Sequence, residues 1–513
     1  MEILSAEQIR AWDKYTIEVE PISSVGLMER AASACYAWLE NNGYAGHSFT
    51  VYCGKGNNGG DGLALARMLA LQGCPVTVNI LEFGHKGTND FQVNLARLHA
   101  SSVEILFIQG EDHFHPITPG DIIIDALLGS GLNRKLDGVT ALLVEHINQS
   151  GNKIISIDIP SGLFVDSSSN GNPSIHAAHT LSFQCFKRAF LMPENALSIG
   201  QVHILDIGLR EEYLQQVTGE HEFVDPAIIQ AIFKPRQHFA HKGNFGHALL
   251  VSGSYGKMGA AVLAGKACLR SGAGLLTCHI PVCGYAILQT TLPEAMVLTD
   301  KDERINTVIP GDSDLAGYST IGIGPGIGTA SATKTMLKDI LGRFRKPMVL
   351  DADALNILAA DPSLFASVPP YSILSPHPKE FERLFGVAEN DFSRIKLATD
   401  KAREHQCIII LKGHYTFIAM PGGKGYFNST GNPGMAKGGS GDVLTGILTA
   451  LLSQGYSSGE AAIFGVYLHG LAGDLAAVSL SQESMLATDL TDHLGRAFLL
   501  LADARANSIL PGS

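Results

Sequence analysis

The sequence predicts an α/β protein of two domains, each built on a mostly parallel sheet with helices on both faces. Two observations lead to this prediction. Short apolar runs alternate with helical stretches along both halves of the chain, which is typical of strand–helix–strand units. The chain also has 513 residues, more than one hydrophobic core normally supports.

The elements of the first half follow from apolar runs bounded by turn residues. Strands are expected at 48–53, 75–81, 121–126, 153–159 and 203–208, with helices at 61–71, 89–100 and 139–149. The second half repeats the pattern, with strands at 248–251, 274–280, 320–323, 348–350, 372–374 and 407–411, and helices at 258–271, 329–343, 391–405, 442–453 and 460–476. The stretch 210–239 is polar and contains two prolines, so we expect it to separate domains at 1–212 and 225–506.

Composition narrows the class of protein. Hydrophobic residues make up 45% and charged residues 17%, as in an ordinary globular protein. A net charge of −12 with no run of Lys or Arg argues against a nucleic-acid partner. The eight cysteines are scattered without a CxxC pair, which disfavours zinc and disulfides and favours a reducing compartment. The acidic start and the lack of an eighteen-residue apolar run lead us to expect a cytoplasmic protein with no membrane partner.

A glycine- and asparagine-rich turn follows the first strong strand, with the sequence CGKGNNGGDGL at 53–63. Its glycines let the backbone turn tightly and approach a ligand, and Asp61 is expected to begin a helix whose amide end attracts phosphate. Asn57 and Asn58 offer carbonyl oxygens to a cation or hydrogen bonds to a ribose. The alternative is an ordinary strand–helix turn with incidental glycines.

Two aspartates end further apolar strands of the first half. Asp125 lies in DIIIDALLGSGL and Asp158 in ISIDIPSG, with Ser161 three residues beyond it. The carboxyl ends of parallel strands share one edge of a sheet, where ligands bind, so these residues and Asn58 are expected to lie together. Each aspartate alone could be a helix cap. Together they favour a functional site with a hard cation bound by oxygen atoms.

The most informative run of the second half is NSTGNPGMAKGGSGDVLTGILTALL at 428–452. Gly438, Gly439 and Gly441 precede a helix expected to open at Asp442, so consecutive amides would face an incoming anion. An aspartate beside such an anion hole can take a proton from a hydroxyl. The alternative is a flexible glycine/serine loop.

Four other residues in the second half stay ambiguous from the sequence alone. His377 could be a core or capping histidine, and Lys412 a solvated charge at a strand end. Asp351 and Asp353 follow another strand, where lining the site and capping a helix are equally plausible.

The first-half motifs GNNGGDG, DALLGSGL and DIPSG, with LMERAA at 27–32, resemble the YjeF N-terminal domain, the NAD(P)H-hydrate epimerase family. The resemblance covers about residues 1–210 and implies a Rossmann-like α/β/α domain. It implies a potassium ion at Asn58, Asp125 and Ser161, and Asp158 as the acid/base at the epimerised carbon. It also implies binding of the hydrated nucleotide by Asn57, Asn58, Gly59, Gly60, Asp61, Gly129, Ser130, Gly131, Leu132, Asn133, Arg134, Lys135 and Asp158.

The GSGD run of the second half resembles the ribokinase-like superfamily. With KGNFGHALLVSGS, IGPGIG, SPHPKEFERLFG and LKGHYT, it is similar to the ADP/ATP-dependent NAD(P)H-hydrate dehydratases over about residues 225–506. The resemblance implies ADP as co-substrate, magnesium held mainly by its phosphates, and Asp442 as the base. The residues implied around the hydrated nicotinamide are Ala260, Gly326, His377 and Asp442. Those implied at the adenine nucleotide are Lys412, Gly413, His414, Tyr415, Thr416 and Gly441.

The expected function is therefore a bifunctional repair enzyme that acts on NADHX and NADPHX and assembles as a homo-oligomer. One rival is a small-molecule kinase, since kinases share the GSGD anion hole, but a kinase has no use for a fused NNGGD domain. The other is a non-catalytic nucleotide sensor, which would not need both Asp158 and Asp442.

Overall fold

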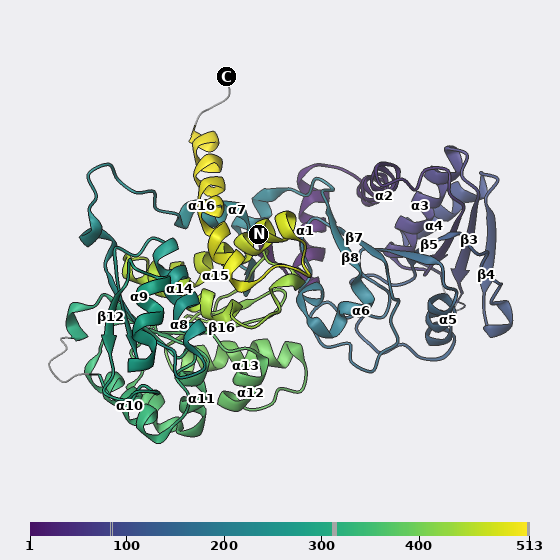
Figure 1. Ribbon diagram of the computed structural model, residues 1–513. Helices are drawn as coiled ribbons and strands as arrows, with labels where there is room; N and C mark the ends of the chain where they lie inside the picture. Colours follow the sequence, from purple (N-terminus) through teal and green to yellow (C-terminus); the bar gives the residue numbers. More distant parts are fainter. Residues whose placement is uncertain (83, 85, 310–314, 510–513) are drawn as a thin grey trace. The chain divides into compact units, whose positions relative to one another are not determined.

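The computed structural model describes residues 1–82, 84, 86–309 and 315–509, and these form two compact units (Figure 1). The first unit comprises Met1–Glu220 with Asn390–Phe392, and the second comprises His221–Glu389 with Ser393–Ser513. The division between Glu220 and His221 falls inside the polar stretch 210–239. Both units are α/β, as the alternation of elements predicts.

The first unit contains a seven-stranded parallel sheet with the strand order β4-β3-β2-β5-β6-β7-β8. Its strands are β2 (Phe49–Cys53), β3 (Val76–Leu81), β4 (Glu104–Ile108), β5 (Ile122–Ala126), β6 (Lys153–Ile157), β7 (His179–Phe183) and β8 (Gln201–Leu205). Every residue of β2 and β5 is buried, as expected for central strands covered on both faces. The chain leaves β2 toward β3 and returns on the other side at β5, so the switch point lies between β2 and β5.

The helices of the first unit are α1 (Ala6–Val19), α2 (Ser24–Asn41), α3 (Asn57–Leu71), α4 (Asn89–His99), α5 (Gly138–Gln149) and α6 (Ala196–Ile199). Helix α3 begins at Asn57, four residues before the predicted start at Asp61, and its residues 58–66 are all buried. The glycines explain this close packing. A Cβ on Gly59 would lie 1.8 Å from the carbonyl oxygen of Gly54, and one on Gly62 would lie 2.6 Å from the Cβ of Ala126.

The sheet of the second unit has the order β9-β18-β17-β16-β15-β14-β13-β10-β11-β12. The strands are β9 (His221–Phe223), β10 (His247–Val251), β11 (Leu275–Ile280), β12 (Met296–Thr299), β13 (Thr320–Ile323), β14 (Val349–Leu350), β15 (Ile373–Leu374), β16 (Ile408–Leu411), β17 (Phe417–Ala419) and β18 (Gly425–Phe427). The strands from β12 to β16 along this order are parallel, and β17 is antiparallel to both neighbours. The order reverses between β10 and β13, which is the switch point here.

The helices of the second unit are α7 (Pro226–Ile232), α8 (Met258–Arg270), α9 (Tyr285–Thr291), α10 (Ser331–Arg343), α11 (Asp353–Ala360), α12 (Pro378–Phe385), α13 (Asp391–Glu404), α14 (Ser440–Ser453), α15 (Ser458–Leu480) and α16 (Ala487–Ile509). Helix α14 packs against α8, and its residues 443–453 are buried. Helix α15 has the length and apolar composition of a membrane span, but 67% of its apolar window is buried inside the structure, and core helices pass the same test.

Candidate active sites

A cleft of about 1180 Å³ opens at the carboxyl edge of the first sheet, at the switch point between β2 and β5. Most of the predicted nucleotide-binding residues line it, namely Asn57, Asn58, Asp61, Gly129, Ser130, Gly131, Leu132, Asn133, Arg134 and Asp158. Gly59, Gly60 and Lys135 are not among its lining residues. Gly60 faces the protein interior, since a Cβ there would lie 2.7 Å from the side chain of Met28.

Asn58 and Asp125 are both buried, and of the two only Asn58 is among the residues that line the cleft. Among the described residues, neither amide atom of Asn58 has a hydrogen-bond partner, although both are buried. The Asp125 carboxylate accepts hydrogen bonds from Ser161 Oγ at 2.6 Å, Ser161 N at 2.9 Å and Ser156 Oγ at 2.7 Å. Burial raises the pKa of Asp125 and these hydrogen bonds oppose the rise. Asp125 is therefore hydrogen-bonded to Ser161, whereas the side-chain nitrogen and oxygen of Asn58 have no hydrogen-bond partner among the described residues.

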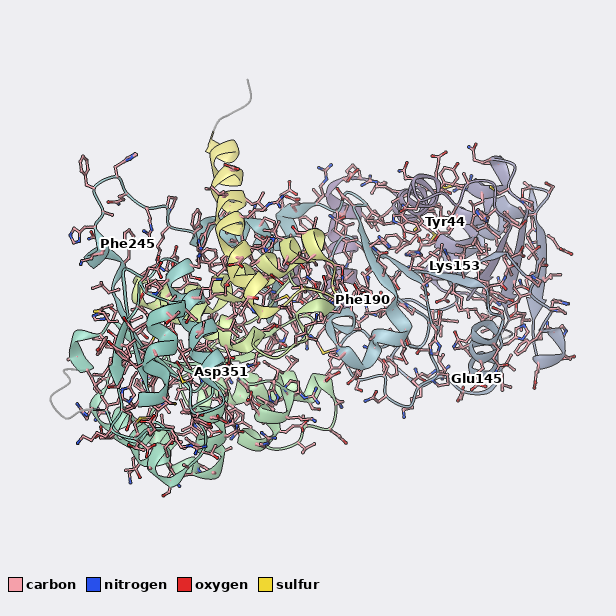
Figure 2. The ribbon with its side chains drawn as sticks, in the orientation of Figure 1. Tyr44, Glu145, Lys153, Phe190, Phe245 and Asp351 are labelled. Carbon is pink, nitrogen blue, oxygen red and sulfur yellow. The ribbon has the colours of Figure 1, made fainter. Side chains whose placement is uncertain are left out.

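Asp158 follows β6 in a strained backbone conformation, with φ +68°. Its Oδ1 lies 2.8 Å from Nζ of Lys187, and its Oδ2 accepts a hydrogen bond of 2.8 Å from Ser130 N. The Lys187 side chain is 1% exposed, donates to Ser182 Oγ at 2.6 Å and lies 5.6 Å from the ring centroid of Phe190, which is labelled in Figure 2. The buried Lys187 ammonium and the Asp158 carboxylate therefore form an ion pair at the cleft.

Two residues of this site have no motif in the sequence. The only signal for Lys187 is a lysine inside the apolar run 183–192, where a buried cation requires a paired anion. Asp13 on α1 gives no signal at all, yet it lines the cleft. Its pKa is raised to about 7 by burial and then by the charge of Asp158, against an opposing effect of Lys187. Burial also raises the pKa of Asp61, helped by the charges of Asp158 and Asp13.

The glycine-rich loop of the second unit leads into α14. Gly439 is the N-cap with φ +96°, and the helix begins at Ser440, two residues before the predicted Asp442. Asp442 therefore lies in the first turn, where the backbone amides of the helix are free to bind an anion. Its pKa is raised to about 6 by burial and then by the charge of Asp351, while Lys412 lowers it.

Asp351, labelled in Figure 2, lines this site and does not cap α11. Its Oδ1 lies 3.0 Å from Nζ of Lys412, and its Oδ2 accepts a hydrogen bond of 2.8 Å from Thr445 Oγ1 on α14. The N-cap of α11 is Ala352, which makes no side-chain capping bond. Asp353 accepts a hydrogen bond of 2.8 Å from Gly328 N, so it holds the loop after β13.

The other predicted residues follow strands at the same carboxyl edge, on loops except for Ala260, which lies in the first turn of α8. Gly326 has φ +66°, and a Cβ on it would lie 3.2 Å from the Cβ of Ala260. His377 caps α12: its Nδ1 accepts hydrogen bonds from the backbone N–H groups of residues 379 and 380, and its side chain is 46% exposed. Lys412 N donates to Pro376 O at 3.1 Å, which joins the His377 loop to the Lys412 loop.

The segment predicted at the adenine nucleotide forms a closed turn after β16. Thr416 Oγ1 donates to Gly413 O at 2.9 Å and accepts from Gly413 N at 3.3 Å. The rings of His414 and Tyr415 have centroids 4.3 Å apart. Gly441 faces this turn, because a Cβ there would lie 3.4 Å from Nζ of Lys412. The structure thus brings Gly441, Asp442, Asp351 and Lys412 together.

Each unit therefore presents acidic groups of perturbed pKa beside glycine-rich backbone at the carboxyl edge of a parallel sheet. This combination defines an α/β protein with two sites for phosphate-bearing ligands and proton transfer.

Comparison with known proteins agrees with this class. Residues 24–189 match the family model described as YjeF-related protein N-terminus, and residues 248–496 match that of NAD(P)H-hydrate dehydratase. The chain is 35% identical over 511 residues to the bifunctional NAD(P)H-hydrate repair enzyme Nnr of Moorella thermoacetica, covering 96% of each chain. It is 34% identical to the Nnr of Escherichia coli, covering 96% of this chain and 93% of that one.

A solved structure matches the second unit. It is the ADP/ATP-dependent NAD(P)H-hydrate dehydratase of Bacillus subtilis co-crystallised with ATP and Mg²⁺, at 33% identity and a TM-score of 0.49, covering 55% of this chain and 98% of that one. From the relatives that match over nearly its whole length, the chain belongs to the family of bifunctional NAD(P)H-hydrate repair enzymes.

Proposed function

We propose that the two units catalyse successive steps in the repair of NAD(P)HX, the form of NADH or NADPH that has added water to its nicotinamide ring. The first unit interconverts the (R) and (S) epimers, and the second dehydrates the (S) epimer with ADP. One observation carries this proposal: each unit has its own carboxylate site at a separate sheet edge, as two independent reactions on one substrate require.

In the second unit, dehydration requires a hydroxyl to leave the ring, and hydroxide is a poor leaving group. Asp442 takes the proton from this hydroxyl, and the oxygen attacks the terminal phosphate of ADP, releasing AMP. The lone pair of the ring nitrogen then expels phosphate, and loss of a ring proton completes NAD(P)H. The amides of residues 438–442 stabilise the transferring phosphoryl group.

Lys412 through Thr416 and Gly441 are the residues that we assign to ADP, with Ala260, Gly326 and His377 around the nicotinamide. Among the described residues no group of three or more His, Cys, Asp or Glu side chains could hold a metal ion. Mg²⁺ would therefore be held mainly by the phosphates of ADP, whose charge it would neutralise during transfer.

In the first unit, the residues fit the potassium ion that the family resemblance implies. Asn58 has a buried carbonyl oxygen without a partner, and oxygen ligands suit a hard cation. Asp125 and Ser161 would hold it with Asn58, and its charge would help to bind the substrate phosphates. The loop 129–135 and residues 57–61 would bind the nucleotide around it.

The place of action is also a proposal. All eight cysteines are unpaired, which supports a reducing compartment such as the cytoplasm. The absence of membrane and nucleic-acid partners and the homo-oligomeric state stay predictions.

The decisive experiment follows the near-ultraviolet absorbance of NADH in an equilibrated mixture of (R)- and (S)-NADHX. With the protein and ADP, both epimers should return to NADH. Without ADP no NADH should form. Recovery of only the (S) half would remove the epimerase assignment, and transfer of phosphate to an unrelated hydroxyl compound without NADH recovery would favour a kinase.

A further inference from the structure

We propose that Asp13 is the proton donor of the first site, that Asp158 is its base, and that Lys187 is a positioning residue that holds the Asp158 carboxylate at the cleft. This inference rests on the epimerase activity proposed above. It adds a catalytic group on α1 to the two strand-end aspartates and names the function of a buried lysine.

Two donors hold the carboxylate of Asp158 at the cleft. Each of its oxygens has a partner, Lys187 Nζ at 2.8 Å and Ser130 N at 2.8 Å. The Lys187 side chain is 1% exposed and requires a negative partner, because an unpaired buried cation is costly. The Asp158 carboxylate is therefore fixed in place, with its side chain among those that line the cleft.

Asp13 has the opposite surroundings in the same cleft. Within the described part of the chain, no residue makes a hydrogen bond or salt bridge to its carboxylate, although it lies close enough to Asp158 to be affected by its charge. Burial and this neighbour raise the pKa of Asp13 to about 7, against the opposing charge of Lys187, so about half of the Asp13 carboxyl groups are protonated at neutral pH. Two carboxyl groups in such different surroundings within one cleft can act as an acid and a base.

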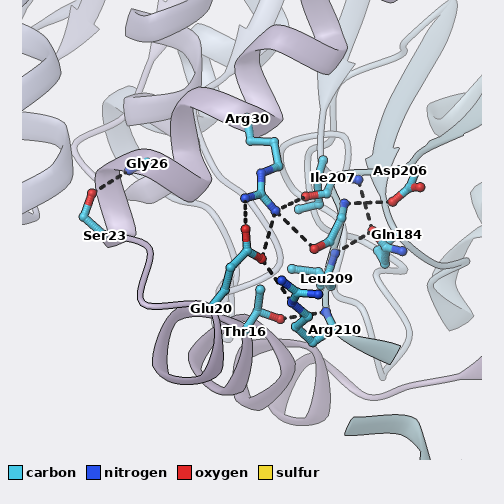
Figure 3. Close-up of polar contacts among 11 residues, drawn as sticks. Thr16, Glu20, Ser23, Gly26, Arg30, Gln184, Asp206, Ile207, Leu209 and Arg210 are labelled. Carbon is cyan, nitrogen blue, oxygen red and sulfur yellow. Dashed lines mark hydrogen bonds and ion pairs between the residues drawn. The ribbon is translucent and has the colours of Figure 1, made fainter. Parts of the chain in front are cut away.

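The fold holds Asp13 at the cleft through the neighbouring turns of α1. Trp12 Nε1 donates to Arg210 O at 2.7 Å, and Arg210 N donates to Thr16 Oγ1 at 3.1 Å. Figure 3 shows further contacts that hold this helix. Glu20, just beyond α1, pairs with Arg30, and the Arg30 guanidinium also donates to Ile207 O at 3.2 Å. Ile207 itself lines the cleft, so α1 is fastened directly to the cleft wall.

The proposed step balances without a further reactant. Asp13 protonates the ring hydroxyl, the C–O bond breaks, and the nitrogen lone pair forms a C=N bond as water leaves. A water molecule then adds to the opposite face of the same carbon, forming a new C–O bond while Asp158 takes its proton. Solvent returns this proton to Asp13, and nothing is oxidised or reduced.

The test replaces Asp13 in the full-length protein and measures epimerisation of (R)-NADHX. Asp13→Asn should lower kcat about 100-fold or more with little change in KM, because it keeps the shape of the cleft but cannot donate this proton. Wild-type epimerisation should fall as the pH rises through about 7, and the variant should lack this decline. Asp13→Glu should restore part of the rate.

The matched control is Glu18→Gln, the same change on an exposed residue of the same helix, which should behave as wild type. The inference is overturned if Asp13→Asn keeps the wild-type rate, or if its residual activity keeps the decline near pH 7. It is also overturned if KM rises while kcat stays constant. Failure of the wild-type chain to epimerise would instead remove the proposed function itself.

Discussion

The two units use the same electrostatic arrangement at unrelated sites. Each pairs a lysine with an aspartate, Lys187 with Asp158 at 2.8 Å and Lys412 with Asp351 at 3.0 Å. Each then places a second, half-buried aspartate within reach of that pair. The pKa of this second carboxyl rises, to about 7 for Asp13 and about 6 for Asp442, with burial as the main cause.

The difference between the sites lies in which protonation state is useful. In the mechanism proposed for the second unit, the perturbed group, Asp442, is the base and must lose its proton. In the mechanism proposed for the first unit, the perturbed group, Asp13, is the acid and must keep its proton. The ion pair also differs: Asp351 holds Thr445 of α14 and so orients the helix, whereas Asp158 itself faces the ligand cleft. One arrangement of charges can therefore serve opposite directions of proton transfer.

The largest effect should come from Asp442→Asn, which removes the base and keeps the shape of the loop. Dehydration of (S)-NADHX with ADP should fall by about 10²- to 10⁴-fold, while epimerisation should be unchanged. Both rates are measured on the same preparation. Asp339→Asn, an exposed aspartate on α10, is the control and should retain both activities. Near-normal NADH recovery by Asp442→Asn would contradict the assignment of the base.

The converse change, Asp158→Asn, should remove epimerisation by about 100-fold or more and leave dehydration of pure (S)-NADHX unaffected. The reason is that Asp158 lines the first-unit cleft and has no group of the second site among its partners. Equal loss of both activities would show that the sites are coupled or that the variant misfolds.

The two ion pairs should differ in their contribution to stability. Lys187→Met leaves Asp158 without its buried partner and should lower the unfolding free energy of the first unit by about 3–5 kcal/mol. The side chain of Asp351 is 2% exposed, against 14% for Asp158, so Lys412→Met leaves a more deeply buried carboxylate and should lower the unfolding free energy of the second unit by more. Urea unfolding of each variant measures this. A smaller loss for Lys412→Met would show that burial of the remaining aspartate does not set the difference.

The opposite protonation requirements predict opposite pH dependences. Dehydration should fall by about tenfold for each pH unit below about 6, as Asp442 becomes protonated. Epimerisation should fall in the same way above about pH 7, as Asp13 loses its proton. Rates of both activities measured from about pH 5 to about pH 9 test the comparison directly. Parallel profiles for the two activities would contradict it.

The sequence predicts the architecture and the motif loops well, because apolar strands and glycine turns are local signals. Central strands such as β2 and β5 are continuous apolar runs, and the loops that follow them carry Asn58 and Asp125. The short strands β17 and β18 are missed, since three residues give too little periodicity. The start of α3 is misplaced by four residues because its glycines pack against the sheet and do not merely form a turn.

Asp13 and Lys187 could not be predicted as site residues. Their importance depends on contacts between residues that are distant in the chain, such as the ion pair between Lys187 and Asp158. The same holds for Asp351, for which sequence leaves capping and site lining equally open. Its ion pair with Lys412 and its hydrogen bond from Thr445, 94 positions away, assign it to the site.

The smallest effect should come from separating the units. Each has its own buried core, which is what independent folding requires. We therefore place the cut between Glu220 and His221, where the two units divide. A second fragment that started near residue 222 would lose part of β9, and a first fragment that ended near residue 214 would interrupt the 3-10 helix Glu211–Gln215.

Residues 1–220 should then epimerise NADHX, and residues 221–513 should dehydrate the (S) epimer with ADP, each within about twofold of the full-length rate. Each catalytic set lies within its own unit, so no reacting group is lost by the cut. Steady-state rates of the two fragments, alone and mixed, measure this. Insoluble fragments beside a soluble full-length protein would mean that one unit needs the other to cover apolar surface. Soluble but inactive fragments would mean that residues are supplied across the boundary, and the comparison between two self-sufficient sites would then fail.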